Sequence, residues 1–240
     1  MNTSPLLILG MHRSGTSCLA GCLEAGGLAL GKVNTAAGFN KKGNREHEGI
    51  RSIHDALLAH HGFSWDRPPP GQVAWRAADL EALDRETRAL SEEASWGMKD
   101  PRTVFCMDGW QTRFTPRLVV TYRHPEAVAA SLMKRSMAWK QPMTHQTAIS
   151  LWLAYNGEIL RLVSGSDIQC IRYDIEADTY KASVADIAGQ LGLDARAAVS
   201  FFSAELINND WAGHPVPEIC LPVWDRLTAL SAMKASSTVT

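Results

Sequence analysis

Short apolar runs alternate along the chain with longer segments whose apolar residues recur every three or four positions. The short runs predict β-strands at residues 6–9, 96–99, 118–122 and 168–173. The periodic segments predict helices over residues 14–26, 51–61, 79–94, 144–163, 181–191, 195–202 and 222–233, and from Pro125 onward. This alternation favours an α/β fold, in which a mainly parallel sheet is flanked by helices on both faces.

The length of 240 residues fits one large domain or two small ones, and we expect a single α/β domain over residues 1–240. The proline-rich segment 66–71 is short and fits a loop inside that domain. Hydrophobic residues make up 45% of the chain, as in ordinary soluble proteins. The 24 Lys and Arg against 25 Asp and Glu give a net charge of −1, which argues against a nucleic-acid partner.

Several other classes of protein are disfavoured by the sequence. No apolar run approaches the ~18 residues that a membrane-spanning helix needs, and residues 1–9 lack the pattern of a signal peptide. We therefore expect a cytoplasmic protein without a membrane span. The five cysteines form no CxxC pair, which disfavours a disulfide framework or a metal site and predicts mostly buried thiols.

A glycine-rich turn, residues 10–17 (GMHRSGTS), joins the first predicted strand to the first predicted helix. Its backbone N–H groups can form a cradle for a phosphate, with hydroxyl donors from Ser14, Thr16 and Ser17. The nucleoside-triphosphate loop GxxxxGK[ST] has a lysine where this chain has Thr16, and the strong cation here is Arg13. The turn therefore favours a ligand with one phosphate on the loop and a transferable group beside Arg13. An ordinary strand–helix turn is the alternative.

A second turn, residues 122–125 (YRHP), ends the third predicted strand. Arg123 closes a buried strand, where a guanidinium needs a partner, and Ser131 follows in the next helix. The two side chains can converge on one phosphate, and a structural arginine bonded to backbone carbonyls is the alternative. Residues 99–140 hold eight Lys or Arg and three Asp or Glu, a net charge of +5, which favours a multiply anionic ligand.

Four segments together resemble the sulfotransferases. Residues 7–17 are similar to the loop that binds the 5′-phosphosulfate group in that family. Residues 122–125 with Ser131 are similar to its 3′-phosphate site, including the eight-residue spacing. Residues 96–102 (WGMKDPR) resemble a segment of bacterial members, and residues 172–174 (RYD) resemble a late strand that usually ends in Tyr-Glu. The likeness spans roughly residues 5–210.

The resemblance implies a P-loop-like sulfotransferase fold and 3′-phosphoadenosine 5′-phosphosulfate (PAPS) as the donor, with no metal required. The sulfuryl group passes to a hydroxyl or amine of a small-molecule, sugar or lipid acceptor, and adenosine 3′,5′-bisphosphate is released. The arginine of the first turn is implied to stabilise the leaving bridging oxygen, the amides after it to bind the 5′-phosphate, and the second turn to bind the 3′-phosphate. The residues implied are Arg13, Ser14, Gly15, Thr16, Ser17, Arg123 and Ser131.

The chain departs from the eukaryotic cytosolic members in two ways. Their loop cation is a lysine, whereas this chain has Arg13, as in the tyrosyl-protein and some bacterial members. It also lacks their glycine-rich basic segment near the carboxyl end. The resemblance therefore defines the 5′ contacts of the donor better than its adenine and 3′-phosphate contacts.

An acceptor hydroxyl needs a proton acceptor within hydrogen-bond reach. Members of the family often carry a glutamate in a Gly-x-x-Glu setting, matched here by Gly43 and Glu46, and we predict that Glu46 is the base. A helix-start carboxylate is the alternative for this residue. The other candidates for the base are His12, His47, Glu48 and Asp100.

Other residues and functions stay open at this point. Lys99 and Arg102 either contact the sulfonate or acceptor, or belong to structural ion pairs. Three tryptophans are candidates for an acceptor pocket or for the core: Trp65, Trp75 and Trp139. The alternative functions are a P-loop kinase of a small metabolite, which needs ATP and magnesium, and a non-catalytic nucleotide-binding module.

Overall fold

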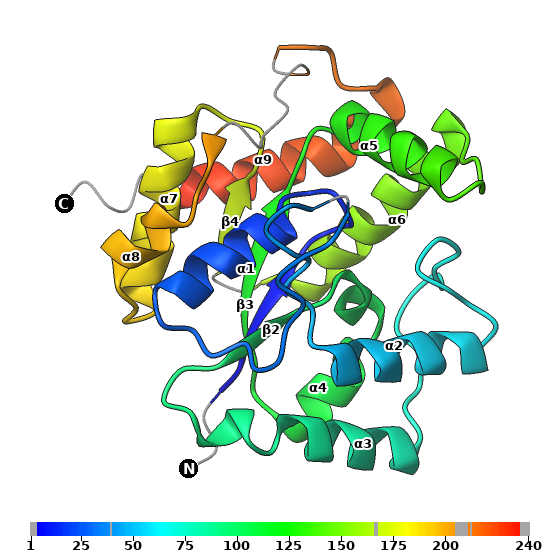
Figure 1. Ribbon diagram of the computed structural model, residues 1–240. Helices are drawn as coiled ribbons and strands as arrows, with labels where there is room; N and C mark the ends of the chain where they lie inside the picture. The colour runs from blue at the N-terminus through cyan, green and yellow to red at the C-terminus, as the bar shows by residue number, and fades with distance from the viewer. Residues whose placement is uncertain (1–3, 39, 166–167, 205–210, 212, 236–240) are drawn as a thin grey trace.

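The computed structural model describes residues 4–38, 40–165, 168–204, 211 and 213–235. Four parallel strands form one sheet in the order β2-β1-β3-β4 (Figure 1). Their bounds are β1 Leu6–Leu9, β2 Gly97–Lys99, β3 Arg117–Tyr122 and β4 Gln169–Arg172. The four strands predicted from the apolar runs are therefore confirmed, because a strand buried on both faces of a sheet needs a continuous apolar run.

Helices connect the strands and account for most of the described chain. The α-helices are α1 Thr16–Ala25, α2 Glu48–His60, α3 Ala77–Thr87, α4 Met107–Arg113, α5 Pro125–Ala138, α6 His145–Leu162, α7 Ala177–Gln190, α8 Ala195–Ser200 and α9 Leu221–Ala235. Short 3-10 helices are η1 Leu90–Glu92, η2 Pro101–Phe105 and η4 Glu218–Cys220. Each predicted helix has a counterpart in the structure.

One predicted helix needs correction, and one helix was not predicted. The helix predicted over residues 79–94 begins at Ala77, because Asp79 closes a capping box with Arg76, and it ends at Thr87 before η1. The sequence also gave no indication of α4, whose Gly109 weakens the helical pattern. A Cβ at Gly109 would lie 2.2 Å from the Trp75 ring, so this glycine is required by packing.

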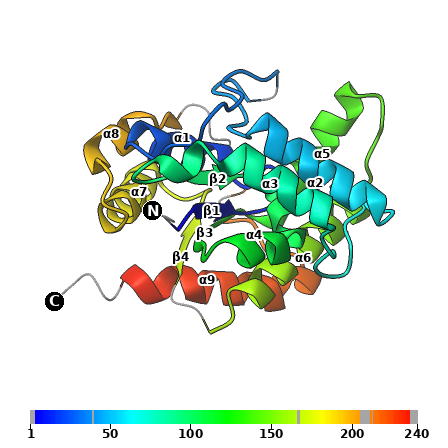
Figure 2. The same ribbon diagram turned by 90° about the horizontal axis from the view of Figure 1, so that it is seen from below.

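The sheet separates two hydrophobic cores. Leu7 and Leu9 of β1 face one core with side chains of α4, α5, α6 and α9. Leu6 and Ile8 face the other core, which is closed by α1, α7 and α8 (Figures 1 and 2). Because successive strand residues point to opposite faces, alternate side chains of β1 are buried under different layers of helices. The predicted fold class, helices on both faces of a parallel sheet, is confirmed.

The order of the strands fixes where a ligand can enter. The chain passes from β1 to β2 on one side and then to β3 on the other, so the connections diverge at the carboxyl ends of β1 and β3. Open α/β sheets bind ligands in the crevice at such a point. A Cβ at Gly10, directly after β1, would lie 2.6 Å from the Thr121 carbonyl oxygen of β3. Glycine is therefore needed where the loop leaves the sheet.

All five cysteines have free thiols, and four of them are buried, as the sequence predicts; Cys18 is half-buried. In the described part of the chain, every helix is too short or too polar to span a membrane.

Candidate active site

The glycine-rich loop has the backbone of an anion cradle. Arg13 and Gly15 both have left-handed backbones, with φ of 67° and 86°, and α1 begins directly afterwards at Thr16. The first amides of an α-helix have no acceptor within the helix, and within the described residues no side-chain hydrogen bond caps this end of α1. The loop amides and the positive end of α1 therefore favour an anion.

Gly15 is held in place by the neighbouring strand. A Cβ at Gly15 would lie 2.3 Å from the ring of Tyr173, which follows β4. Tyr173 is itself fixed by its backbone N–H, which donates to the Tyr122 carbonyl at 2.8 Å. The glycine therefore serves both the left-handed turn and the close approach of this ring.

A pocket of about 430 Å³ opens in front of this loop. It is lined by 18 described residues from the loop and the start of α1, from α5, from the segments around residues 40–42 and 201–203, and at Arg123, Tyr173 and Trp211. Six of these are cationic: Arg13, Lys41, Lys42, Arg123, Lys134 and Arg135. Among the described lining residues there is no Asp or Glu. Such a concentration of unopposed positive charge fits a multiply anionic ligand.

Residues predicted from the two turns meet in this pocket. Arg13 Nε donates to Ser131 Oγ at 2.8 Å, and Arg123 Nη1 donates to the Arg13 carbonyl at 3.4 Å. The Arg123 guanidinium lies 5.5 Å from the centre of the Tyr173 ring. Burial lowers the pKa of Arg13, and the charge of Arg123 adds to this effect. Two guanidinium groups held so close together favour an anion between or beside them.

The hydroxyl residues of the loop have different environments. Thr16 and Ser17 line the pocket, and Ser17 Oγ donates to the Asn44 carbonyl at 2.9 Å. Ser14 is fully buried, does not line the pocket, and its carbonyl accepts from Thr121 Oγ1 at 3.0 Å. Its own Oγ has no hydrogen-bond partner in the described structure. The Ser14 side chain thus lies behind the loop, between α1 and the sheet.

Glu46 lies outside the pocket lining, in a buried ion pair. Its Oε1 accepts from Lys99 Nζ at 2.7 Å, and the Lys99 side chain is only 2% exposed. Burial lowers the pKa of Lys99, and the negative charge of Glu46 opposes that shift. Of the two roles left open for Lys99, the structure thus shows an ion pair.

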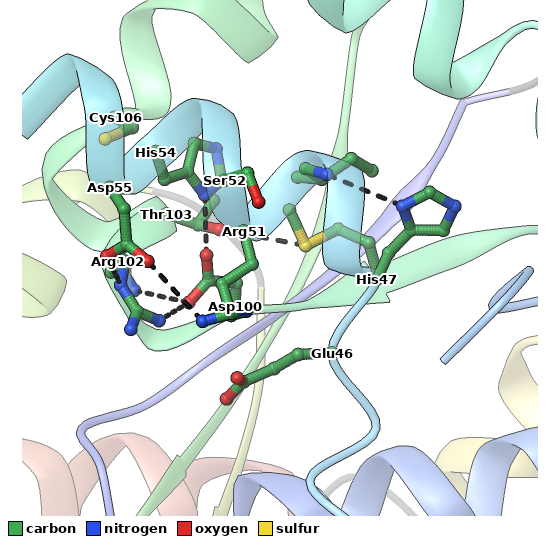
Figure 3. A network of polar contacts seen from close by, with 12 residues as sticks. Glu46, His47, Arg51, Ser52, His54, Asp55, Asp100, Arg102, Thr103 and Cys106 are labelled. Atoms are coloured by element: carbon green, nitrogen blue, oxygen red, sulfur yellow. Dashed lines mark hydrogen bonds and ion pairs between the residues drawn. The ribbon is translucent and has the colours of Figure 1, made fainter. Parts of the chain in front are cut away.

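Asp100 and Arg102 belong to a buried network beside α2 (Figure 3). Arg102 binds the carboxylates of both Asp100 and Asp55, and Asp100 also caps η2. Trp110 Nε1 donates to His54 Nε2 at 3.1 Å, so the other ring nitrogen of His54 carries the proton that it donates to Asp100 at 2.8 Å. Burial disfavours a charged Asp100, but Arg102 and His54 outweigh it and hold the pKa of this carboxyl low. The network joins α2 to η2.

The remaining candidates for the base have separate positions. His12 is buried, its ring centre lies 4.9 Å from that of Trp65, and its Nε2 has no hydrogen-bond partner in the described structure. Burial lowers the pKa of His12 well below its usual value, and Arg102 adds to the shift. His47 is the residue before α2 and caps it, and Glu48 is exposed on the first turn of that helix.

The three candidate tryptophans divide into two groups. Trp65 and Trp139 lie with ring centres 6.5 Å apart, and the guanidinium of Arg135 lies against both rings. Trp75 instead covers Gly109 and donates to the Cys106 carbonyl at 3.2 Å, inside the core near His54. Only Trp65 and Trp139 therefore remain next to the candidate site.

Sequence reasoning did not identify several residues of the pocket. Lys41, Lys42 and Phe201 come from segments far apart in the chain, and Lys42 donates to the Phe201 carbonyl. Lys134 and Arg135 lie on α5 at the helical spacing that continues from Ser131. The sequence contains this signal, because residues three and four positions after Ser131, a predicted site residue, lie on the same side of the helix.

No protein-family model and no curated protein matches the chain. Solved structures do. The sulfotransferase domain of the Synechococcus PCC 7002 olefin synthase superposes with a TM-score of 0.52 and 18% identity, over 99% of this chain and 95% of that domain. The sulfotransferase domain from the curacin biosynthetic pathway superposes with a TM-score of 0.57 and 12% identity, over 94% and 97%.

The chain has the sulfotransferase fold. Sulfotransferase STF1 from Mycobacterium tuberculosis H37Rv adds a third match, with a TM-score of 0.51 and 16% identity over 97% of this chain and 77% of that one. At these identities the matches establish the fold, which the sequence resemblance predicted. The matches assign no site residue and no chemistry to this chain, and these are inferred from its own geometry.

Proposed function

We propose that the protein transfers a sulfuryl group from PAPS to a hydroxyl or amine of a small-molecule, sugar or lipid acceptor. The observation that carries this proposal is the pocket itself. A glycine-rich loop that has Arg13 and no lysine meets Arg123 and Ser131 in one cationic cavity, on a sulfotransferase fold. A loop built this way suits a phosphosulfate better than a triphosphate.

The residues of the pocket fit the donor. Amides of Gly15, Thr16 and Ser17 at the start of α1 supply donors for the 5′-phosphate. Arg123 and Ser131 lie where a second phosphate can be bound, one charge-assisted and one through a hydroxyl. Cationic side chains fill the role that magnesium plays in nucleoside triphosphatases, and no metal is required by this scheme.

The transfer needs charge stabilisation and positioning more than covalent chemistry. A lone pair on the acceptor oxygen forms the new O–S bond, while the bond from sulfur to the bridging oxygen breaks and its electron pair stays on the departing 5′-phosphate. Arg13 stabilises that developing negative charge. Glu46 takes the acceptor proton, and Lys99, at 2.7 Å, holds its carboxylate in place.

Arg13→Ala tests the central assignment. We expect turnover with PAPS to fall about 100-fold or more, because a donor aimed at the developing charge is lost. Arg196→Ala is the matched control, since Arg196 is an exposed arginine on α8, away from the pocket lining. Full turnover in Arg13→Ala would refute the assignment of this residue.

The alternative functions give different results in binding experiments. A kinase should bind ATP with magnesium in calorimetry and should not bind adenosine 3′,5′-bisphosphate. A non-catalytic module should bind the bisphosphate tightly and should show no turnover with a broad panel of acceptors. A sulfotransferase should bind the bisphosphate and consume PAPS when an acceptor is present.

A further inference from the structure

Helix α5 presents one face to the donor pocket. The lining residues on this helix, spaced three and four positions apart, are Ala127, Ala130, Ser131, Lys134 and Arg135. Residues at this spacing lie along one side of an α-helix. The first three are small and admit a ligand close to the helix, and the last two are cationic. Arg135 thus stands one turn beyond Ser131, which is hydrogen-bonded to Arg13.

The guanidinium of Arg135 lies against two aromatic rings. It lies 5.2 Å from the centre of the Trp65 ring and 4.2 Å from that of Trp139. The described residues give this group no hydrogen bond and no ion pair. The two rings are nearly perpendicular, with an interplanar angle of 85°, so the guanidinium can lay a flat face on at most one of them. Contacts with aromatic rings do not occupy its N–H donors in strong hydrogen bonds. Those donors are therefore available to a ligand in the pocket.

Arg135 interacts electrostatically with residues assigned to both halves of the proposed reaction. Burial lowers the pKa of Arg135 to about 10, and the positive charge of Arg13 acts in the same direction, while Glu46 opposes it. The group therefore feels both the residue proposed to stabilise the leaving oxygen and the residue proposed as the base. An in-line transfer places the sulfur between those two points.

We propose that Arg135 binds the non-bridging oxygens of the sulfuryl group during its transfer. This inference rests on the proposed function. The roles proposed for Arg13, Arg123 and Ser131 are at the leaving oxygen and the 3′-phosphate, so none of them is assigned to the negative sulfonate oxygens. A planar fork of N–H donors suits two such oxygens. Trp65 and Trp139 hold the guanidinium plane in position, so that little side-chain freedom is lost on binding.

Arg135→Gln tests this assignment without an acceptor. Calorimetry measures the dissociation constants of adenosine 3′,5′-bisphosphate and of PAPS, which differ by the sulfuryl group. In the variant we expect bisphosphate affinity within about twofold of wild type and PAPS affinity about tenfold weaker, since one charged hydrogen-bonding group is lost. Unchanged affinity for both ligands overturns the proposal. Equal weakening of both also overturns it, because Arg135 would then bind the bisphosphate part.

Two further variants keep the experiment decisive. Arg135→Lys retains the charge and loses the planar fork, so we expect an intermediate loss of PAPS affinity, about threefold. Lys140→Gln removes an exposed charge just beyond the end of α5 and should bind both ligands like wild type. If Arg135→Gln does not fold, as judged by its melting curve, the lysine variant carries the test. Wild-type protein that binds neither ligand overturns the proposed function as well, whereas bisphosphate binding with no effect of Arg135 overturns this inference alone.

Discussion

Two arginine-rich regions lie close together at the carboxyl ends of the strands, and they differ in charge balance. In the network beside α2, Arg102 binds two carboxylates, Asp100 and Asp55. In the donor pocket, Arg13 and Arg123 lie next to each other, and the described lining has no carboxylate. The first region pairs its cations with carboxylates of the fold, and the second gathers cations on a described lining without a carboxylate, which favours an anionic ligand.

This difference separates structural from ligand-binding cations, which the sequence alone does not. Arg102 and Arg123 both follow a buried strand, and both are about 7% exposed. A guanidinium with two carboxylate partners stabilises the folded state, and removing one partner leaves a buried charge. A guanidinium beside another guanidinium costs free energy until an anion arrives. Substitutions in the network beside α2 should therefore mainly lower stability, and substitutions in the pocket should mainly weaken ligand binding.

The largest expected effect on stability comes from Asp100→Asn. It removes the more deeply buried of the two carboxylates that Arg102 binds, since Asp100 is 1% exposed, so we expect the free energy of unfolding to drop by about 3–5 kcal/mol in urea titrations. Asp84→Asn is the control, since its pair with Arg113 is partly exposed and should contribute under about 1 kcal/mol. Equal losses in the two variants would contradict the structural role of the network.

Gly15→Ala should come next and should affect both stability and the pocket. The new Cβ meets the Tyr173 ring and also strains a left-handed backbone, so we expect a stability loss of roughly 2–3 kcal/mol and at least about tenfold weaker bisphosphate binding. Gly62→Ala is the matched control, because Gly62 has φ of 79° and open space around its Cβ position. It should show only the backbone strain, about 1 kcal/mol, and unchanged binding.

Arg123→Gln should separate binding from folding. We expect bisphosphate affinity to fall roughly 10- to 100-fold, because a charge-assisted contact to phosphate is lost. The melting temperature without ligand should stay within about 2 °C of wild type, since the lost contacts are offset by reduced repulsion from Arg13. Calorimetry and thermal melts on the same samples check both values. A large drop in melting temperature with intact binding would reverse the comparison.

The smallest expected effect is a pH dependence of stability that comes from His12. Burial lowers the pKa of this histidine, and the positive charges of Arg102 and Arg135 lower it further. Its pKa is lowered in the folded state, so the unfolded chain binds more protons below about pH 6.5, and stability falls as the pH falls through that range. Each such histidine contributes at most about 1.4 kcal/mol per pH unit. Between about pH 7.5 and 5.5, wild type should lose more stability than His12→Asn in urea titrations. His47 and His124, whose pKa values are also lowered, are common to both proteins, and parallel losses would exclude His12.

Most of the fold was predictable from hydrophobic patterning. The four strands are short apolar runs buried on both faces, and each was located to within one residue at either end. The corrections come from interactions that patterning does not contain. The start of α3 depends on the side chains of Arg76 and Asp79. Helix α4 contains Gly109 because the ring of Trp75 leaves no room for a Cβ at that position.

The site was predictable where it follows directly from the ends of strands. Arg13 lies in the loop after β1 and Arg123 directly after β3, and these strands are adjacent and parallel, so the topology brings the two residues together. Lys42 and Phe201 meet only through the packing of distant loops, which no local pattern shows. The ion pairs of Lys99 with Glu46 and of Arg102 with Asp55 likewise depend on α2 and the segment before it, which no local pattern around residues 99–102 shows.

The hydrogen bond between Arg13 Nε and Ser131 Oγ joins the two ends of the proposed donor site. A phosphate that engages Ser131 competes with Arg13 for that hydroxyl, and a group that engages Arg13 releases it. The two ends are therefore thermodynamically coupled, and the coupling is reciprocal. Fragments that each carry one phosphate should bind non-additively, so the intact nucleotide is recognised as a unit and not as the sum of its halves.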